Sequence, residues 1–152
     1  MDWAKLRDLV VALEAGDADA IAAAGEARFR CIISRAYYAA LCYARDLTIA
    51  RLREKYRPSE VHARVPVAVL ELGRLPAARW APNGLNSLSK VSHDLERLRR
   101  SRVTADYDSD QSCTAEDARR AVEMCRRVFA TLDRIPWDAA GPSSTGTPAN
   151  AS

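Results

Sequence analysis

Residues 29–47 read FRCIISRAYYAALCYARDL, and this stretch decides the fold class. Its apolar positions are separated by four, three, four, four and three residues, which traces one face of an α-helix. They are Phe29, Ile33, Ala36, Ala40, Ala44 and Leu47. The spacing predicts the longest helix of the chain, continuing to about Arg53 and closed by Pro58. Alternating β-branched runs are absent from the sequence, so we expect an all-α protein with no β-sheet.

The flanking segments carry helical spacing as well. A weaker helix follows Ser59, although Pro66 must either delay its start or kink it. Thr114 is the expected N-cap of the final helix, whose apolar stripe extends to Leu132. The remaining expectations are a short helix over residues 2–14, a loop over residues 76–84, a helix over residues 85–102 with basic last turns, and a disordered tail over residues 136–152.

Length and composition limit the classes of protein to consider. With 152 residues, one domain over residues 1–135 is expected, with a tail behind it. Lys and Arg total 23 against 20 Asp and Glu, so the net charge of +3 does not by itself indicate a nucleic-acid partner. The four cysteines form no CxxC pair and are expected to be reduced and mostly buried. No apolar run is long enough to span a membrane, so we expect a soluble, cytoplasmic protein.

Two segments together resemble a known family. The sequence SRAYYAAL at residues 34–41, followed by LRRSRVTADYDSD at residues 98–110, resembles the HEPN domain, named for higher eukaryotes and prokaryotes nucleotide-binding. The histidine in EVHARVPVAVL, residues 60–70, strengthens the resemblance. The sequence ADYD at residues 105–108 suggests an ADYD-type variant. The resemblance implies an up-and-down bundle of about four main helices that usually dimerises, with the end of the third helix facing its symmetry mate.

The resemblance leaves two functions open. Many HEPN domains are metal-independent endoribonucleases in toxins or antiviral effectors, using an arginine and a histidine four to six residues later, across a dimer. Here Arg102 can take the arginine's place, but Val103 replaces the following polar residue and Tyr107 stands where the histidine would be. A phenol with an ordinary pKa near 10 is a poor base at neutral pH. Arg102 and Tyr107 are therefore the catalytic candidates of the less favoured alternative.

The leading prediction is a non-catalytic or divergent binding module. It would act with RNA, a nucleotide or a partner protein, such as a nucleotidyltransferase-type or other toxin–antitoxin partner, in prokaryotic defence. The family places its two motifs side by side, so their polar residues are predicted to share one pocket. These are Arg35, Tyr38, Arg102, Asp106 and Tyr107. Arg97, Arg99 and Arg100 add positive charge for weak, salt-sensitive phosphate contacts, although several could simply reach solvent or nearby acids.

An architectural interpretation of the same residues predicts different contacts. Asp106 would then pair with Arg35 or Arg102, and the Tyr107 ring would pack across the bundle. His62 would be a helix-start residue at the surface or bonded to a nearby carbonyl, and its spacing from Arg57 a coincidence.

The acidic turn after the basic helix has a second possible interpretation. Its alternating acids from Asp106 echo a calcium loop, but the required turn glycine is replaced by Gln111. We therefore expect no metal site and no cofactor.

Overall fold

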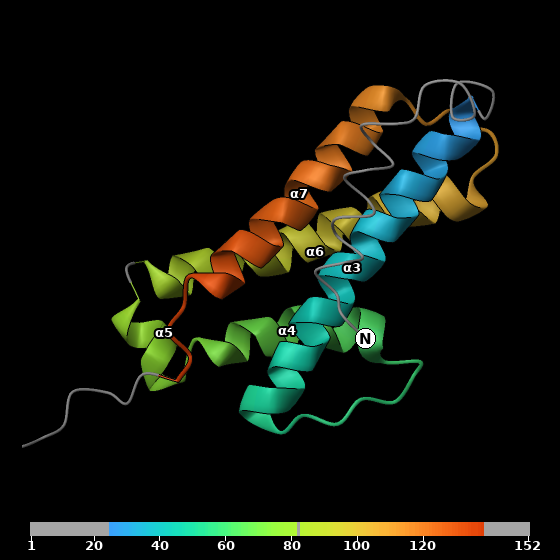
Figure 1. Ribbon diagram of the computed structural model, residues 1–152. Helices are drawn as coiled ribbons and strands as arrows, with labels where there is room; N and C mark the ends of the chain where they lie inside the picture. Colours follow the sequence, from blue (N-terminus) through green and yellow to red (C-terminus); the bar gives the residue numbers. More distant parts are fainter. Residues whose placement is uncertain (1–24, 82, 139–152) are drawn as a thin grey trace, which may run out of the picture.

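The structure is a computed structural model that describes residues 25–81 and 83–138. These residues form five helices and no strand, which confirms the all-α prediction. The four longer helices are α3 (Glu26–Leu52), α4 (Val61–Leu72), α6 (Gly84–Tyr107) and α7 (Ala115–Asp133), and the short α5 (Pro76–Trp80) precedes α6. Figure 1 shows α3 and α7 running alongside each other, with α6 crossing both at an angle and α4 crossing one end of α3. The helix expected over residues 2–14 lies outside the described residues.

Helices α3 and α6 form the centre of the bundle, because α3 contacts α4, α6 and α7, and α6 contacts all four of the other described helices. Three alanines on its apolar face, Ala36, Ala40 and Ala44, are fully buried. Small side chains let neighbouring helices approach closely, and larger residues from α6 and α7 fill the space between the helices. Leu95 and Val128 are among these and are completely buried. The face quoted from the sequence is therefore the centre of the hydrophobic core.

Helix α7 begins where its sequence predicted. The Thr114 hydroxyl accepts the backbone N–H of Asp117, and the Asp117 carboxylate accepts the backbone N–H of Thr114. This reciprocal capping box satisfies donors that the first turn leaves open. The Thr114 contacts also lower the pKa of the Asp117 carboxyl, because they favour its charged form. Further along α7, the Phe129 ring stacks on Tyr43 of α3 with ring centres 4.3 Å apart.

Three boundaries differ from the sequence expectations. Helix α4 runs without a break through Pro66, whose ring is buried in the helix interface. The segment expected as a loop over residues 76–84 contains α5, which has Pro76 in its first turn. The expected tail lies outside the described residues from residue 139 onward, but its start contacts the bundle. Trp137 packs on the core and its Nε1–H donates to the Leu132 carbonyl at 2.8 Å.

No helix in the described part of the chain is both long and apolar enough to cross a membrane.

Candidate functional site

Arg102, in the last turns of α6, is the centre of the candidate site. Its Nη2 donates to the hydroxyl of Tyr38 on α3 at 2.8 Å and to that of Tyr107 at 3.2 Å. The Arg102 Nε lies 2.6 Å from Asp106 Oδ2, one helical turn further on, as an ion pair without hydrogen-bond alignment. The structure thus brings together four of the five residues that the sequence placed in one pocket.

The two tyrosines also present their rings to Arg102. The guanidinium carbon lies 5.3 Å from the Tyr38 ring centre and 4.9 Å from the Tyr107 ring centre, both within cation–π range. Burial lowers the pKa of Arg102, but the Tyr107 hydrogen bond and the charge of Asp106 help to raise it overall. Arg102 therefore remains a fixed cation at every physiological pH.

Asp106 joins the two sequence motifs. Its Oδ2 accepts a hydrogen bond from the Ser34 hydroxyl at 3.3 Å, and Ser34 is the first residue of the SRAYYAAL motif. The side chains of Arg102 and Asp106 are only 16% and 25% exposed, so their ion pair is partly shielded from water. Of the two arginines expected to pair with Asp106, the structure shows Arg102. Arg35 is exposed and, among the described contacts, makes no hydrogen bond or ion pair with this cluster.

The C-terminal end of α6 is held by Arg30, which sequence reasoning missed. The Arg30 Nη1 donates to the carbonyls of Ala105 at 2.9 Å and Asp108 at 3.0 Å, in the last turn of α6 and just beyond it. A cation here satisfies open carbonyls and opposes the negative end of the helix dipole. Glu26 pairs with Arg30 and accepts the Cys113 backbone N–H, and these two contacts lower the pKa of the Glu26 carboxyl. The position of the ADYD segment is therefore fixed from α3.

His62 is the second residue that the sequence did not assign to the site. Its Nδ1 lies 2.6 Å from the Tyr37 hydroxyl, and its ring stacks on Tyr37 with centres 5.7 Å apart. The same ring meets Tyr38 edge-on at 6.1 Å. The expectation of a surface ring or a bond to a carbonyl is therefore wrong. Tyr38 lies between His62 and Arg102 and connects them in one cluster.

The proton between Tyr37 and His62 can be assigned from burial. Tyr37 is 1% exposed, and burial raises the pKa of its hydroxyl to about 12. A buried hydroxyl that kept its proton without an acceptor would carry a desolvation cost, so Tyr37 donates to His62 Nδ1. Burial, followed by the charges of Arg102 and Arg99, lowers the pKa of His62. His62 is therefore neutral at pH 7, with its proton on Nε2.

Tyr107 takes a different position from the one the architectural interpretation gave it. Its ring is 72% exposed and covers Arg102 from the solvent side, instead of packing across the bundle. The reason lies in α6 itself, which ends at Tyr107, so the side chain has no neighbouring helix to cover it. An exposed aromatic ring over a cation is a surface on which a planar ligand can stack.

The other arginines of the basic run spread around α6. Arg99 approaches Glu96 at 3.8 Å, whereas Arg97 and Arg100 are exposed on other faces of the helix. Successive helical residues point about 100° apart, so these three do not form a single patch with Arg102. Asp94, another acid expected to take one of them, pairs instead with Arg127 of α7.

The alternating acids at the end of α6 and just beyond it have protein partners. Asp106 pairs with Arg102, and Asp108 Oδ1 accepts the backbone N–H groups of Asp110 and Gln111 at 3.2 Å each. Asp117 is engaged in the capping box of α7. Within residues 25–81 and 83–138, no group of three or more His, Cys, Asp or Glu side chains is arranged to hold a metal ion. The segment is a turn closed by its own hydrogen bonds.

The chemistry of this cluster suits anion binding better than proton abstraction. It offers a permanent cation, two tyrosine rings and the Nε2–H of His62 as donors and stacking surfaces. A general base needs an unprotonated nitrogen or oxygen facing the substrate. The free ring nitrogen of His62 carries a proton in the assigned form, and the Tyr107 hydroxyl is bonded to Arg102.

Comparison with known proteins gives one match. The family model described as HEPN domain matches residues 18–135. No curated protein and no solved structure matches the chain.

Proposed function

Because this chain belongs to the HEPN domain family, we propose that it is a non-catalytic or divergent, ADYD-type HEPN module that binds the phosphate of RNA or a nucleotide at Arg102. The family membership is consistent with a nucleotide- or RNA-related function. The observation that carries the finer proposal is the guanidinium of Arg102, held between the rings and hydroxyls of Tyr38 and Tyr107.

The arrangement matches the two parts of a nucleotide. Arg102 supplies charge-assisted hydrogen bonds for a phosphate, and its Nη1 is not used by any protein contact in the described residues. The exposed ring of Tyr107 supplies a face on which a base can stack. Neither a guanidinium bound to phosphate nor an aromatic ring distinguishes one base from another, so binding at this site would carry little sequence preference.

A binding function is favoured over ribonuclease activity because neither Tyr107 nor His62 is suited to act as a general base. Tyr107 occupies the place of the family's histidine and is a poor base. His62 is close to the cluster, which is the one observation in favour of the endoribonuclease alternative using Arg102. For His62 to act as a base, however, its proton would have to move from Nε2 and leave the buried Tyr37 hydroxyl without an acceptor.

The wider setting of the proposal rests on the family resemblance. We propose a homodimer in which the end of α6 faces a second copy, acting with a nucleotidyltransferase-type or other partner protein in prokaryotic defence. Exposed Val103 near the end of α6 supports this placement of the dimer contact, because a large apolar side chain left in water favours a partner surface.

Binding and cleavage measurements on the full chain test the proposal. Calorimetric titration with uridine 5′-monophosphate should show binding that Arg102→Gln weakens at least about tenfold, because a charge-assisted contact is lost. The control is Arg57→Gln, which removes an exposed positive charge from the loop between α3 and α4. Single-stranded RNA should remain intact with the parent protein at neutral pH without metal.

Two results would decide against this function. Equal affinity of the Arg102→Gln variant and the parent would remove Arg102 from the binding site. Robust RNA cleavage that Arg102→Gln abolishes would favour the endoribonuclease alternative instead.

A further inference from the structure

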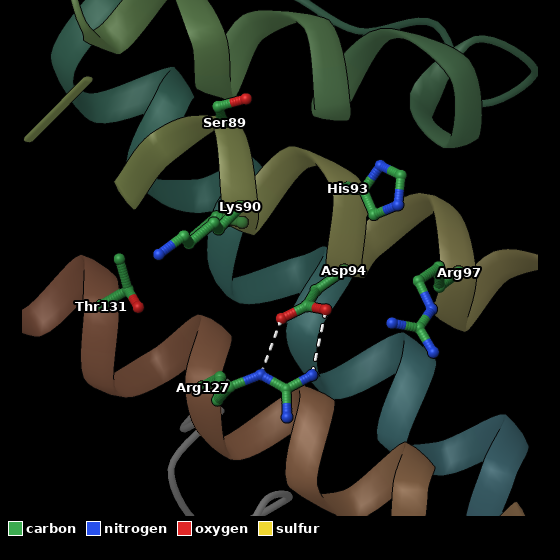
Figure 2. Close-up of a pocket in the computed structure, with 8 residues that line it drawn as sticks. Ser89, Lys90, His93, Asp94, Arg97, Arg127 and Thr131 are labelled. Carbon is green, nitrogen blue, oxygen red and sulfur yellow. Dashed lines mark hydrogen bonds and ion pairs between the residues drawn. The ribbon is translucent and has the colours of Figure 1, made fainter. Parts of the chain in front are cut away.

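A trough runs along the seam between α6 and α7, away from the Arg102 cluster. It consists of two adjoining hollows of about 410 and 640 Å³, which share Lys90 and Thr131 in their walls. Figure 2 shows the first hollow, with Lys90 and Arg97 of α6 on either side of the ion pair between Asp94 and Arg127. The second hollow continues toward the start of α6 and the end of α7.

Helical spacing explains why these residues face one another. On α6, Lys90, Asp94 and Arg97 are four and three residues apart, so they share one face. Facing them at the C-terminal end of α7 is a matching row with the same spacing, formed by Arg127, Thr131 and Arg134. Two rows of polar side chains at helical spacing, over a packed helix pair, form a straight channel.

The single acidic side chain in the described lining of the trough already has a cationic partner. Asp94 is 8% exposed, and both its oxygens accept hydrogen bonds from Arg127 at 3.0 Å. These bonds also raise the pKa of Arg127, so its guanidinium stays charged. Lys90 and Arg97 have no carboxylate partner among the described residues. The trough therefore has a net positive charge.

The rest of the lining is suited to phosphate and sugar oxygens. Its other exposed members carry hydroxyl or amide groups or, at His93, an imidazole, whereas its apolar members are buried. The exposed group includes Asn83, Asn86 and Ser89; the buried group is Ala81, Val91 and Ile135. Asn, Ser, Lys and Arg are the side chains that commonly contact a nucleic-acid backbone.

We propose that the trough binds the backbone of single-stranded nucleic acid. From Asn83 to Arg97 the trough follows fourteen residues of α6, which is about 21 Å at 1.5 Å per residue. A stacked strand rises by about 3.4 Å per nucleotide along its axis, so roughly six nucleotides span this length. Packed helix axes lie about 8–10 Å apart, which leaves room over the seam for one strand and not for a duplex. The trough also lacks a tyrosine or tryptophan in its described lining, so binding should be strongly salt-dependent.

This site is separate from the proposed nucleotide site. Arg102 is five residues beyond Arg97 on α6, a rotation of about 140°, and it faces α3 instead of α7. The class of ligand, RNA, rests on the proposed function. The trough adds a second surface, which holds a strand of several nucleotides. The two surfaces can be tested by different variants and different ligands.

The test compares two double variants of the full chain with equal charge. Lys90→Gln with Arg97→Gln removes two exposed cations from the trough without touching the Asp94–Arg127 pair. The control, Lys55→Gln with Arg57→Gln, removes two exposed cations from the loop between α3 and α4. Fluorescence anisotropy with a labelled twelve-nucleotide oligouridylate gives the affinity and its dependence on salt. Uridine 5′-monophosphate serves as the short ligand.

The trough variant should bind the oligouridylate about tenfold more weakly than the parent, with a salt slope smaller by about 1.4, because two phosphate contacts at about 0.7 each are lost. The control variant and the parent should agree, and neither double variant should change the affinity for the mononucleotide. Equal losses in both double variants, or no loss in either, would overturn the proposal. Polyglutamate competing as well as unlabelled oligouridylate would show an acidic-peptide site and overturn it too.

The result for Arg102→Gln separates this inference from the proposed function. If that variant keeps its affinity for the mononucleotide while the trough variant loses affinity for oligouridylate, the proposed function is wrong and the trough inference is supported. If Arg102→Gln loses the mononucleotide and the trough variant binds oligouridylate like the parent, the trough inference fails alone.

Discussion

Tyr37 and Tyr38 are neighbours in sequence with different surroundings. The Tyr37 ring is buried and its hydroxyl donates to His62, whereas the Tyr38 hydroxyl accepts from Arg102. A rotation of about 100° between successive helical residues places one ring in the core and the other at its edge. The pair therefore links the packing of α3 to the polarity of the site, because moving either ring would shift His62 or Arg102.

Asp106 is predicted to contribute to stability. Asp106→Ala should lower the free energy of unfolding by about 1–2 kcal/mol, between the values for exposed and fully buried ion pairs, because Arg102 stays shielded without its carboxylate. For a chain of this size that corresponds to a melting temperature lower by about 3–6 °C. Differential scanning calorimetry measures it, with Asp110→Ala in the exposed turn as the control. A variant that melts like the parent but no longer binds uridine 5′-monophosphate would place Asp106 in the binding site instead.

His62 predicts a dependence of stability on pH. Its pKa in the folded protein is lowered from about 6.5, so the unfolded chain binds a proton more readily than the folded one. The stabilisation is complete above about pH 6.5 and is lost as the pH falls toward the folded pKa. The melting temperature should therefore fall from pH 7 to pH 5, and His62→Gln should flatten this part of the curve. Nitrogen chemical shifts of the ring at pH 7 should show the proton on Nε2, and a proton on Nδ1 would contradict the assignment.

The residues that sequence reasoning placed correctly share one property. Tyr38, Arg102 and Asp106 lie on two long helices whose periodicity is clear, so the neighbourhood of their motifs could be inferred from the resemblance. His62 could not be placed in this way, because its contact with Tyr37 depends on the path of the loop that joins α3 to α4. The only signal was its position near the start of α4. Helical periodicity does not encode such a path.

At the scale of elements, the turn from α5 into α6 shows where sequence signals mislead. Pro76, Asn83 and Gly84 favour a loop, and the structure uses them instead as helix boundaries. Asn83 has a φ of 58°, in the left-handed region, and α6 begins at the next residue. A Cβ built on Gly84 would lie 1.9 Å from the carbonyl oxygen of Ala78. Glycine is therefore required here for close approach of backbone.

Gly84→Ala is predicted to be strongly destabilising. The added methyl group would meet backbone and not a flexible side chain, so α5 or the start of α6 must move. We expect a loss of at least about 2 kcal/mol, in the range of overpacking in a filled core. Urea unfolding followed by circular dichroism measures it, and Asn86→Ala, exposed two residues further along α6, is the control. Equal midpoints for the two variants would contradict this close approach.

Contacts with other helices also set boundaries that the local sequence does not reveal. The ends of helices are fixed by partners distant in sequence, as Arg30 of α3 fixes the end of α6. Likewise, α4 continues through Pro66 in its second turn, although proline has no N–H to donate to the carbonyl four residues back, and the Pro66 side chain is buried. Local propensity alone favoured a late start or a kink at Pro66. Tertiary packing outweighed it.

At the scale of the whole molecule, α6 is shared by two surfaces. One face meets α3 and carries the Arg102 cluster, and another meets α7 and carries the trough. Both surfaces use a partly or largely buried acid, Asp106 or Asp94, to hold an arginine in place. The bundle thus presents positive charge on two sides of one helix while its core stays apolar.

The proposed dimer makes the last prediction. Val103, near the end of α6, is 46% exposed, and burying such a side chain against a second copy gains about 25 cal/mol per Å² of apolar surface. Light scattering at micromolar concentration should give about twice the chain mass of 16.7 kDa. Val103→Glu should shift the protein to monomer, because a charge buried in the contact would be desolvated without a partner. Leu85→Glu, at an exposed leucine near the other end of α6, should remain dimeric. A parent that is monomeric throughout the micromolar range would exclude the dimer, and dissociation caused by Leu85→Glu alone would move the contact to the other end of the helix.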